Sequence, residues 1–138
     1  MKTVIILRGV SGSGRSTFAN NLIDLLDKKY TYCICEADNF FIKNGEYKFY
    51  PEGLAAAHNY CREKFRNALV NNINLVIVSN TNCAEKEFFY YLDLAKEYSY
   101  YTVVMVVENR HGGINLHSVP EESLNRQQER IKNSLKLR

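Results

Sequence analysis

The sequence lacks any apolar run long enough to cross a membrane. Its first apolar segment, residues 4–7, is too short for the core of a signal peptide, and no cleavage-like segment follows it. Internal repeats, low-complexity stretches and linkers are also missing from the 138 residues. We therefore expect one domain over residues 1–138, in a cytoplasmic protein that does not contact membranes.

Metal-binding cysteine pairs are missing too. None of the four cysteines belongs to a C-x-x-C pair, which argues against a zinc site. Cys33 and Cys35 share one face of a predicted strand. The net charge is small, +3, and it arises within residues 109–138, which hold six basic and three acidic side chains. This local excess fits contact with phosphates, although a solvated tail would look similar.

A segment rich in glycine and serine lies near the start and reads GVSGSGRST from Gly9 onward. It lies between an apolar strand pattern at residues 3–7 and a helical pattern at 14–28, which is the context of a phosphate-binding loop and not of a linker. Glycines let backbone N–H groups turn inward on an anion, and the helix adds its positive end. The nucleotide-binding residues predicted here are Gly9, Val10, Ser11, Gly12, Ser13, Gly14, Arg15, Ser16 and Thr17, with the Ser16 hydroxyl on Mg²⁺.

The rest of the chain alternates between strand and helix signals. Strands are expected at residues 32–36, 75–78 and 101–107, with helices over 54–69, 88–95 and the C-terminal segment. Two capping boxes are predicted, Asn82 with Glu85 and Ser118 with Glu121. The last helix is expected to turn Leu124, Gln128, Ile131 and Leu135 inward. This alternation predicts an α/β fold whose parallel sheet binds ligands beyond the carboxyl ends of its strands.

Several side chains fall at that end of the predicted sheet. Asp38 follows the second strand, where it could accept a proton from a hydroxyl substrate or simply begin a turn. An aromatic-rich segment around Asn44 and Gly45 predicts a hairpin, whose rings could stack on bases or close over the core. His58 lies on an apolar helical stripe, which favours a hydrogen-bonded core residue.

Arginines follow the last strand. Arg126 and Arg130 lie four residues apart on the last helix, and Arg110 lies in the loop before it. Arginine side chains often stabilise a phosphoryl group during transfer from a mobile lid. A solvated helix face would account equally for Arg126 and Arg130.

Taken together, these motifs resemble the 5′-hydroxyl polynucleotide kinase family of P-loop proteins, which includes the kinase domain of T-even phages and small eukaryotic kinase-like domains. The stretches that carry the resemblance are residues 9–17, 38–40, 47–49 with 57–58, 76–82, and 115–120 with Arg126 and 129–130. The resemblance implies a three-layer P-loop kinase fold with a four-stranded parallel sheet flanked by helices. It also implies transfer of phosphate from ATP, with Mg²⁺, to 5′-hydroxyl ends of RNA or DNA.

Roles for individual residues follow from the same resemblance. Asp38 would be the general base, Arg15 and the lid residue Arg126 would neutralise the phosphoryl group, and Arg130 would contact ATP. Phe41, Asn80 and Arg110 would lie at substrate-binding positions.

The chain departs from the family at three positions. Arg15 replaces a lysine, and Phe41 replaces an arginine of the phage enzymes. The family's carboxylate after the third strand falls at Ser79 or Asn80, depending on the branch, and neither residue is acidic. A catalytically weak nucleotide-binding pseudokinase and a small-metabolite kinase are therefore the alternatives.

Overall fold

The computed structural model describes residues 1–110, 112 and 117–135. Four strands form the central sheet: β1 (Thr3–Arg8), β2 (Tyr32–Cys35), β5 (Leu75–Ser79) and β6 (Tyr101–Val106). The helices are α1 (Arg15–Leu25), α2 (Leu54–Val70), α3 (Phe89–Glu97) and α4 (Glu121–Ser134). Short 3-10 turns lie at Ala37–Phe41, Pro51–Gly53 and Glu85–Glu87, and a small hairpin joins β3 (Ile42–Lys43) to β4 (Glu46–Tyr47).

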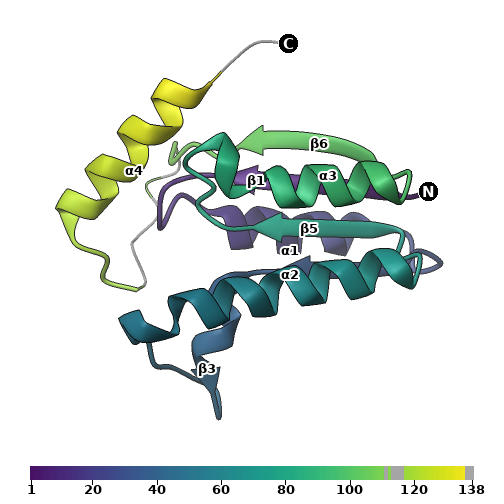
Figure 1. Ribbon diagram of the computed structural model, residues 1–138, viewed down its shortest axis with the longest axis horizontal. Coiled ribbons are helices and arrows are strands. Elements are labelled where there is room, and N and C mark those ends of the chain that lie inside the picture. Colours follow the sequence, from purple (N-terminus) through teal and green to yellow (C-terminus); the bar gives the residue numbers. More distant parts are fainter. Residues whose placement is uncertain (111, 113–116, 136–138) are drawn as a thin grey trace.

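The sheet is parallel, in the order β2-β5-β1-β6, and it is the middle of three layers. Helices α2 and α3 cover one face and α1 covers the other (Figure 1). Helix α4 lies beside the carboxyl ends of the strands, and the small hairpin projects beyond α2 (Figure 1). The predicted fold class, a four-stranded parallel sheet flanked by helices, is confirmed.

Alternation along the central strands explains why both faces are covered. Val4 and Ile6 of β1 point into the larger core cluster, which includes Phe65 of α2 and Tyr91 of α3. Leu7, on the opposite face, joins a smaller cluster with residues of α1. All five residues of β5 are buried, as expected for a strand with helices on both sides.

The first helix is shorter than the sequence predicts, because it ends at Leu25 and not at residue 28. Asp27 competes with further helix by forming a local turn. Its side-chain Oδ1 accepts the N–H of Lys29 at 3.0 Å, and its backbone oxygen accepts the N–H of Tyr30 at 2.9 Å.

Both predicted capping boxes are wrong. Asn82 is buried with φ 46°, and its Nδ2 donates to the backbone oxygen of Leu7 at 2.8 Å, while α3 begins only at Phe89. Ser118 has φ 52°, and α4 begins at Glu121 after Pro120 with no side-chain cap. In each case the hydroxyl or amide that could cap a helix lies in a left-handed loop position.

Two further expectations on helix faces fail. His58 is exposed, because the buried stripe of α2 runs through Ala57, Cys61 and Phe65. Gln128 is exposed and Leu135 lies beyond the end of α4, so the inward side of that helix is carried by Ile131, with Leu124 partly buried.

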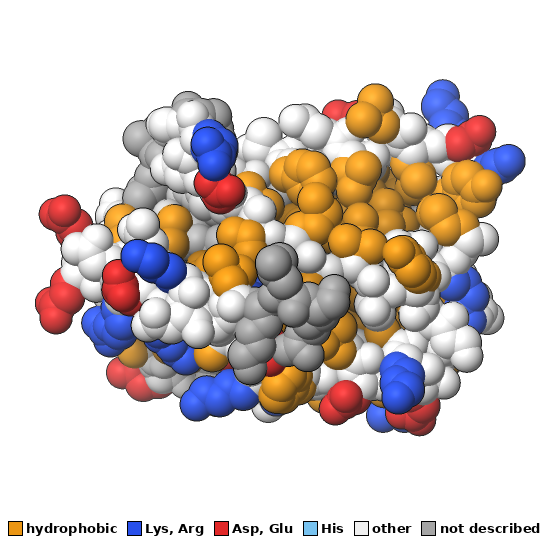
Figure 2. Space-filling view, turned by 90° about the horizontal axis from the view of Figure 1, so that it is seen from above, with side chains coloured by type: hydrophobic (Ala, Val, Ile, Leu, Met, Phe, Trp, Pro, Cys, Tyr) orange, Lys and Arg blue, Asp and Glu red, His pale blue; other side chains and the backbone are white. Residues whose placement is uncertain are grey.

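Strand β6 forms one edge of the sheet, and its outer side has no strand partner among the described residues. Tyr101, Val104 and Val106 are exposed there. Figure 2, which views the molecule from the side of β6, shows a broad group of hydrophobic side chains on this face. Among the helices that the structure describes, none is long and apolar enough to span a membrane.

Candidate functional site

The loop between β1 and α1 has the geometry of an anion-binding turn. Gly12 and Gly14 have φ values of 83° and 101°, which L side chains rarely adopt. A Cβ on Gly9 would lie 2.8 Å from the backbone oxygen of Val107, so this position must also be glycine. Helix α1 then begins at Arg15 without a side-chain cap, which leaves its first N–H groups available to a ligand.

Arg15 is held close to this loop. Burial lowers the pKa of its guanidinium, and the carboxylates of Glu36 and Asp38 partly offset that effect. Among the described residues, three buried side-chain atoms have no hydrogen-bond partner: Ser13 Oγ, Arg15 Nε and Ser79 Oγ. All three belong to the loop or to the end of β5. Unpartnered donors beside a glycine turn are suited to a polyanion such as a triphosphate.

The end of β2 adds two carboxylates near the loop. Glu36 accepts a hydrogen bond from Ser16 Oγ at 2.8 Å. Between Glu36 and Asp38, the backbone N–H of buried Ala37 donates to Asn80 Oδ1 at 2.9 Å. Asn80 therefore fixes the backbone that presents both carboxylates.

Asp38 faces two aromatic side chains. His117 Nε2 lies 3.9 Å from Asp38 Oδ2, and its ring stacks on Tyr47 with ring centroids 3.9 Å apart. Tyr47 also hydrogen-bonds to Asp38. Burial, together with the Asp38 charge and that bond, raises the pKa of Tyr47 to about 12. The phenol thus stays protonated at neutral pH and donates to the carboxylate.

These elements surround one cavity of about 480 Å³. Ser11 and Arg15 of the loop line it together with Asp38 and Asn80. Its other walls come from the hairpin, α2, the segment after His117, and α4. Phe41 contributes to the wall but is only 1% exposed, and its ring packs edge-on against four other aromatic rings. Of the two interpretations of the aromatic hairpin, this packing supports closure over the core.

The three arginines expected at the phosphoryl group, at ATP and at the substrate do not line this cavity. Arg126 is exposed on α4 and does not line it. Arg130 pairs with Glu87 at 2.9 Å, and Arg110 pairs with Glu108 at 2.9 Å. Gln127 of α4 does reach the loop of residues 9–17, here called the phosphate loop, because its Oε1 accepts the backbone N–H of Ser11 at 2.9 Å.

Buried Arg8 contacts the C-terminal end of α4. Its side chain donates to the backbone oxygens of Asn82 and Cys83, at 2.8 and 2.9 Å, and to Ser134 Oγ. Its guanidinium carbon also lies 4.9 Å from the centre of the Phe88 ring. One end of α4 is therefore fixed to the strand that leads into the phosphate loop.

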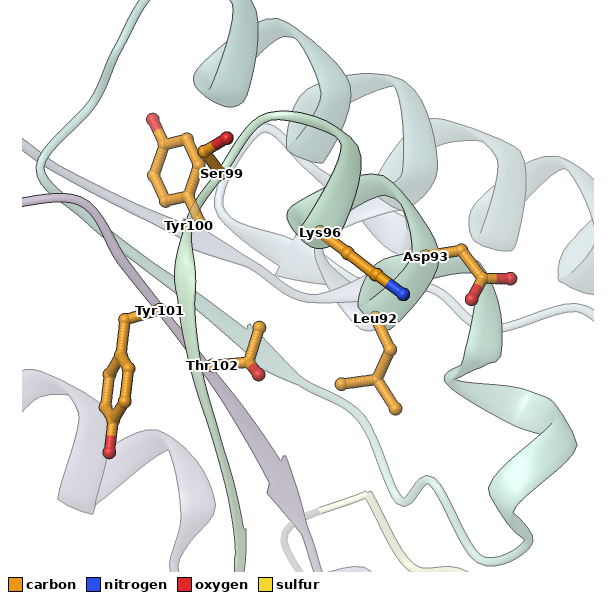
Figure 3. A pocket seen from close by; sticks show the side chains of 7 residues that line it. All are labelled: Leu92, Asp93, Lys96, Ser99, Tyr100, Tyr101 and Thr102. Atoms are coloured by element: carbon orange, nitrogen blue, oxygen red, sulfur yellow. The ribbon is translucent and has the colours of Figure 1, made fainter.

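Two other cavities differ in their relation to the loop. One, of about 660 Å³, adjoins Gly9 and Val10 and continues between the end of β6 and α4. The other, of about 610 Å³, lies between the end of α3 and the beginning of β6, around Lys96 and Tyr100 (Figure 3). Figure 3 shows that its lining comes from α3, from the turn after it and from the first residues of β6. Strand β6 begins at the end of the sheet opposite to the one that carries the loop.

Sequence reasoning missed four residues of this site: Glu36, Tyr47, His117 and Gln127. Glu36 is separated from Ser16 by 20 positions, and the other three reach the site from the hairpin, a loop and the last helix. The motif stretches at residues 47–49 and 115–120 contain Tyr47 and His117, but no role was predicted for either side chain. Asn115 lies outside the described residues.

A glycine loop between a parallel strand and a helix, with acidic side chains at the next strand end, defines a P-loop protein of the kinase-like type, which has a nucleotide-binding fold. The family comparison gives the same result. A family model described as an AAA domain matches residues 4–133, and the chain belongs to this family.

Relatives with sequence similarity include human NEDD4-binding protein 2, 30% identical over 97 residues, which cover 70% of this chain and 5% of that protein. Uncharacterized protein PM0531 of Pasteurella multocida (strain Pm70) is 30% identical over 118 residues, or 79% of this chain and 66% of that protein. The 2′,3′-cyclic-nucleotide 3′-phosphodiesterase of Pongo abelii is 32% identical over 113 residues, which cover 75% of this chain and 24% of that protein. The matched segments thus span between 5% and 66% of these relatives.

Solved structures agree on the fold. The Pnkp1/Rnl/Hen1 complex contains a chain with a TM-score of 0.62 and 23% identity, covering 91% of this chain and 38% of that chain. The APS kinase CysC of Mycobacterium tuberculosis, in complex with AMPPNP and APS, has a TM-score of 0.56 and 16% identity, with coverage of 92% and 68%. The resemblance to the polynucleotide kinase-like P-loop proteins is confirmed at the level of family and fold.

Proposed function

We propose that this chain transfers the γ-phosphoryl group of ATP to the 5′-hydroxyl end of RNA or DNA. The observation that carries the proposal is the shared cavity, in which Asp38 and the phosphate-loop residues Ser11 and Arg15 face the same space. A carboxylate opposite a phosphate-binding turn is what transfer to a hydroxyl acceptor requires. The fold likeness to a chain of the Pnkp1/Rnl/Hen1 RNA repair complex supports this choice of acceptor.

The chain's own residues divide the work as follows. Loop N–H groups and Arg15 bind the triphosphate, and the Ser16 hydroxyl is a ligand suited to Mg²⁺, which supplies charge neutralisation when bound. Asp38 accepts the proton of the attacking hydroxyl while the new O–P bond forms and the bond to the β-phosphate oxygen breaks. Tyr47 and His117 hold the Asp38 carboxylate on the acceptor side.

The cavity beside Gly9 and Val10 offers a place for the nucleoside of ATP. It adjoins the same loop from the other side, between the end of β6 and α4. Leu124 and Ile131 supply apolar contact there, which suits a base. Arg110, which also lines this cavity, would meet the nucleotide and not the acceptor.

The test uses γ-labelled ATP with a 5′-hydroxyl oligonucleotide, in RNA and DNA forms, and the same oligonucleotides bearing a 5′-phosphate. We expect label on the 5′-hydroxyl forms alone. Asp38→Asn should lose transfer by about 10²-fold or more and still bind ATP. Asp93→Asn, an exposed aspartate at the distant cavity, is the matched control and should transfer normally. Transfer unaffected by Asp38→Asn would refute the assigned base.

A second candidate, a weak nucleotide-binding pseudokinase, is favoured by one observation. The end of β5 carries Ser79 and Asn80, so it offers no carboxylate to a metal. ATP binding by the wild type without transfer to oligonucleotides would support this function. Transfer to a small hydroxylated metabolite instead would support the third candidate, which the fold likeness to APS kinase permits.

A further inference from the structure

The end of β5 cannot supply a carboxylate to a bound cation, and the Asn80 side chain is already hydrogen-bonded. Asn80 accepts the N–H of Ala37 at 2.9 Å through Oδ1, and its Nδ2 lies 3.6 Å from Cys61 Sγ. Ser79 is 3% exposed, and its hydroxyl has no hydrogen-bond partner among the described residues. A nucleotide-bound Mg²⁺ would therefore need its carboxylate from another strand.

The end of β2 supplies one. Glu36 follows Cys35 directly, and its Oε1 accepts the hydrogen bond from Ser16 Oγ at 2.8 Å. Ser16 is the hydroxyl residue of the phosphate loop. A hydroxyl and a carboxylate oxygen at this distance form a pair of hard oxygen ligands, and Mg²⁺ in nucleotide sites commonly uses one or two protein oxygens with waters and phosphates. Two protein ligands are therefore enough for a nucleotide-bound Mg²⁺. The described residues contain no group of three or more His, Cys, Asp or Glu that could hold a metal ion.

Asp38 is placed for a different task. It lies two residues further on, beyond buried Ala37, and it faces Tyr47 and His117 on the acceptor side of the cavity. Arg15 lies near both carboxylates, and its buried Nε has no hydrogen-bond partner in the part of the chain that the structure describes. Asp38 thus lines the cavity, whereas Glu36 contacts Ser16 at the start of α1, and the Asn80 hydrogen bond fixes the backbone between the two acids.

We propose that Glu36, together with Ser16, holds the Mg²⁺ of the bound nucleotide, so that β2 supplies the carboxylate that β5 lacks. The inference rests on the proposed nucleotide-dependent function. It gives the two neighbouring acids separate roles: Glu36 binds the metal, and Asp38 accepts the proton of the attacking hydroxyl. The chain would then be a metal-dependent enzyme despite Ser79 and Asn80.

The experiment compares ATP affinity, by calorimetry, in EDTA and across a Mg²⁺ titration, for wild type, Glu36→Gln and Asp38→Asn. Glutamine can still accept the Ser16 hydrogen bond, so the loop should keep its structure, which circular dichroism checks. Glu36→Gln should raise the Mg²⁺ concentration for half-maximal ATP binding by about tenfold or more. In EDTA it should bind ATP as tightly as wild type or more tightly, because a negative charge beside the phosphates is removed.

A second readout does not depend on phosphoryl transfer. Electron paramagnetic resonance of Mn²⁺ with ATP should show tight binding to wild type and to Asp38→Asn, and weak binding to Glu36→Gln. An unchanged metal requirement in Glu36→Gln, or an equal rise in Asp38→Asn, would overturn the inference while leaving the proposed function standing. If wild type binds no ATP with or without Mg²⁺, the proposed function itself fails.

Discussion

Gln127 of α4 accepts a hydrogen bond from the phosphate loop, between its Oε1 and the backbone N–H of Ser11, at 2.9 Å. An oxygen atom of the protein thus stands at the loop where a phosphate oxygen could bind. The carboxamide is neutral, so it competes weakly with a triphosphate and can move aside or turn its NH₂ group toward the phosphate. This contact links the position of α4 to occupancy of the loop.

Replacing this neutral group by a charged one should weaken ATP binding. Gln127→Glu would place a carboxylate near the phosphates, a repulsion of at least about 1 kcal/mol, and we expect a roughly tenfold loss of ATP affinity by calorimetry. Gln127→Met should stay within about threefold of wild type. Asn133→Asp, an exposed change of the same charge on α4, is the control. Equal losses in Gln127→Glu and Asn133→Asp would contradict a role for position 127.

Arg15→Lys should raise turnover several-fold in the transfer assay. Arg15 Nε is buried without a hydrogen-bond partner among the described residues, whereas a lysine carries all its donors on one terminal ammonium that can reach the phosphates. The compact ammonium group of lysine also suits a phosphate loop, whose usual pattern has lysine at this position. Arg15→Ala, which removes the cation, should lower ATP affinity and turnover. Unchanged or lower turnover in Arg15→Lys would mean that the guanidinium is the functional group here.

His117 should act on Asp38 through its ring nitrogen and not mainly through its stacking on Tyr47. His117→Gln keeps an N–H donor near Nε2, and His117→Phe keeps a ring for the stack. We expect the phenylalanine variant to lose turnover about tenfold at unchanged KM for ATP, with the glutamine variant retaining most of it. The reverse ranking, measured by steady-state kinetics, would assign the effect to the ring contact with Tyr47.

The fold could be predicted because its signals are local. Residues 3–7 and 75–78 are continuous apolar runs, and the glycine loop fixes where the first strand ends and the first helix begins. Motif spacing also brought Asp38 and Asn80 to one edge of the sheet. Contacts between segments far apart in the sequence could not be predicted from such local signals. Glu36 is an ordinary acidic residue until β2 sets it beside Ser16, and His117 has no visible partner until its loop meets the hairpin.

The failed capping boxes show why local motifs mislead. Asn82 and Ser118 have the right residue three positions before a glutamate, yet both adopt positive φ. For Asn82 a buried hydrogen bond to Leu7 outweighs a helix cap, because leaving that carbonyl unsatisfied costs more than an exposed cap gains. A tertiary contact thus decided the conformation of Asn82.

Cys33 should be the fastest cysteine to react with iodoacetamide. The hydrogen bond from the Cys35 thiol, helped by Lys64 and opposed by burial, lowers the pKa of Cys33 to about 7, whereas burial raises the pKa of Cys61 and of Cys83. Since the thiolate is the nucleophile, labelling at pH 7.5 should modify Cys33 at least about tenfold faster, as followed by peptide mass spectrometry. Cys35→Ala removes the donor and should slow Cys33. Faster labelling of Cys61 would contradict this order.

Asn82→Ala should destabilise the chain more than any change of an exposed asparagine. Its buried Nδ2 bond to Leu7 is worth about 1–3 kcal/mol when the carbonyl is left unpaired, and alanine at φ 46° adds about 1 kcal/mol. Asn82→Gly avoids the second cost and should lie about 1 kcal/mol above alanine in urea unfolding. Asn71→Ala, which breaks an exposed bond to Asn67, should stay within about 0.5 kcal/mol of wild type. Equal free energies of unfolding for the alanine and glycine variants would show that alanine is not strained at this left-handed position. A small loss of stability in both variants would show that the Asn82 side chain does not link β1 to the segment after β5.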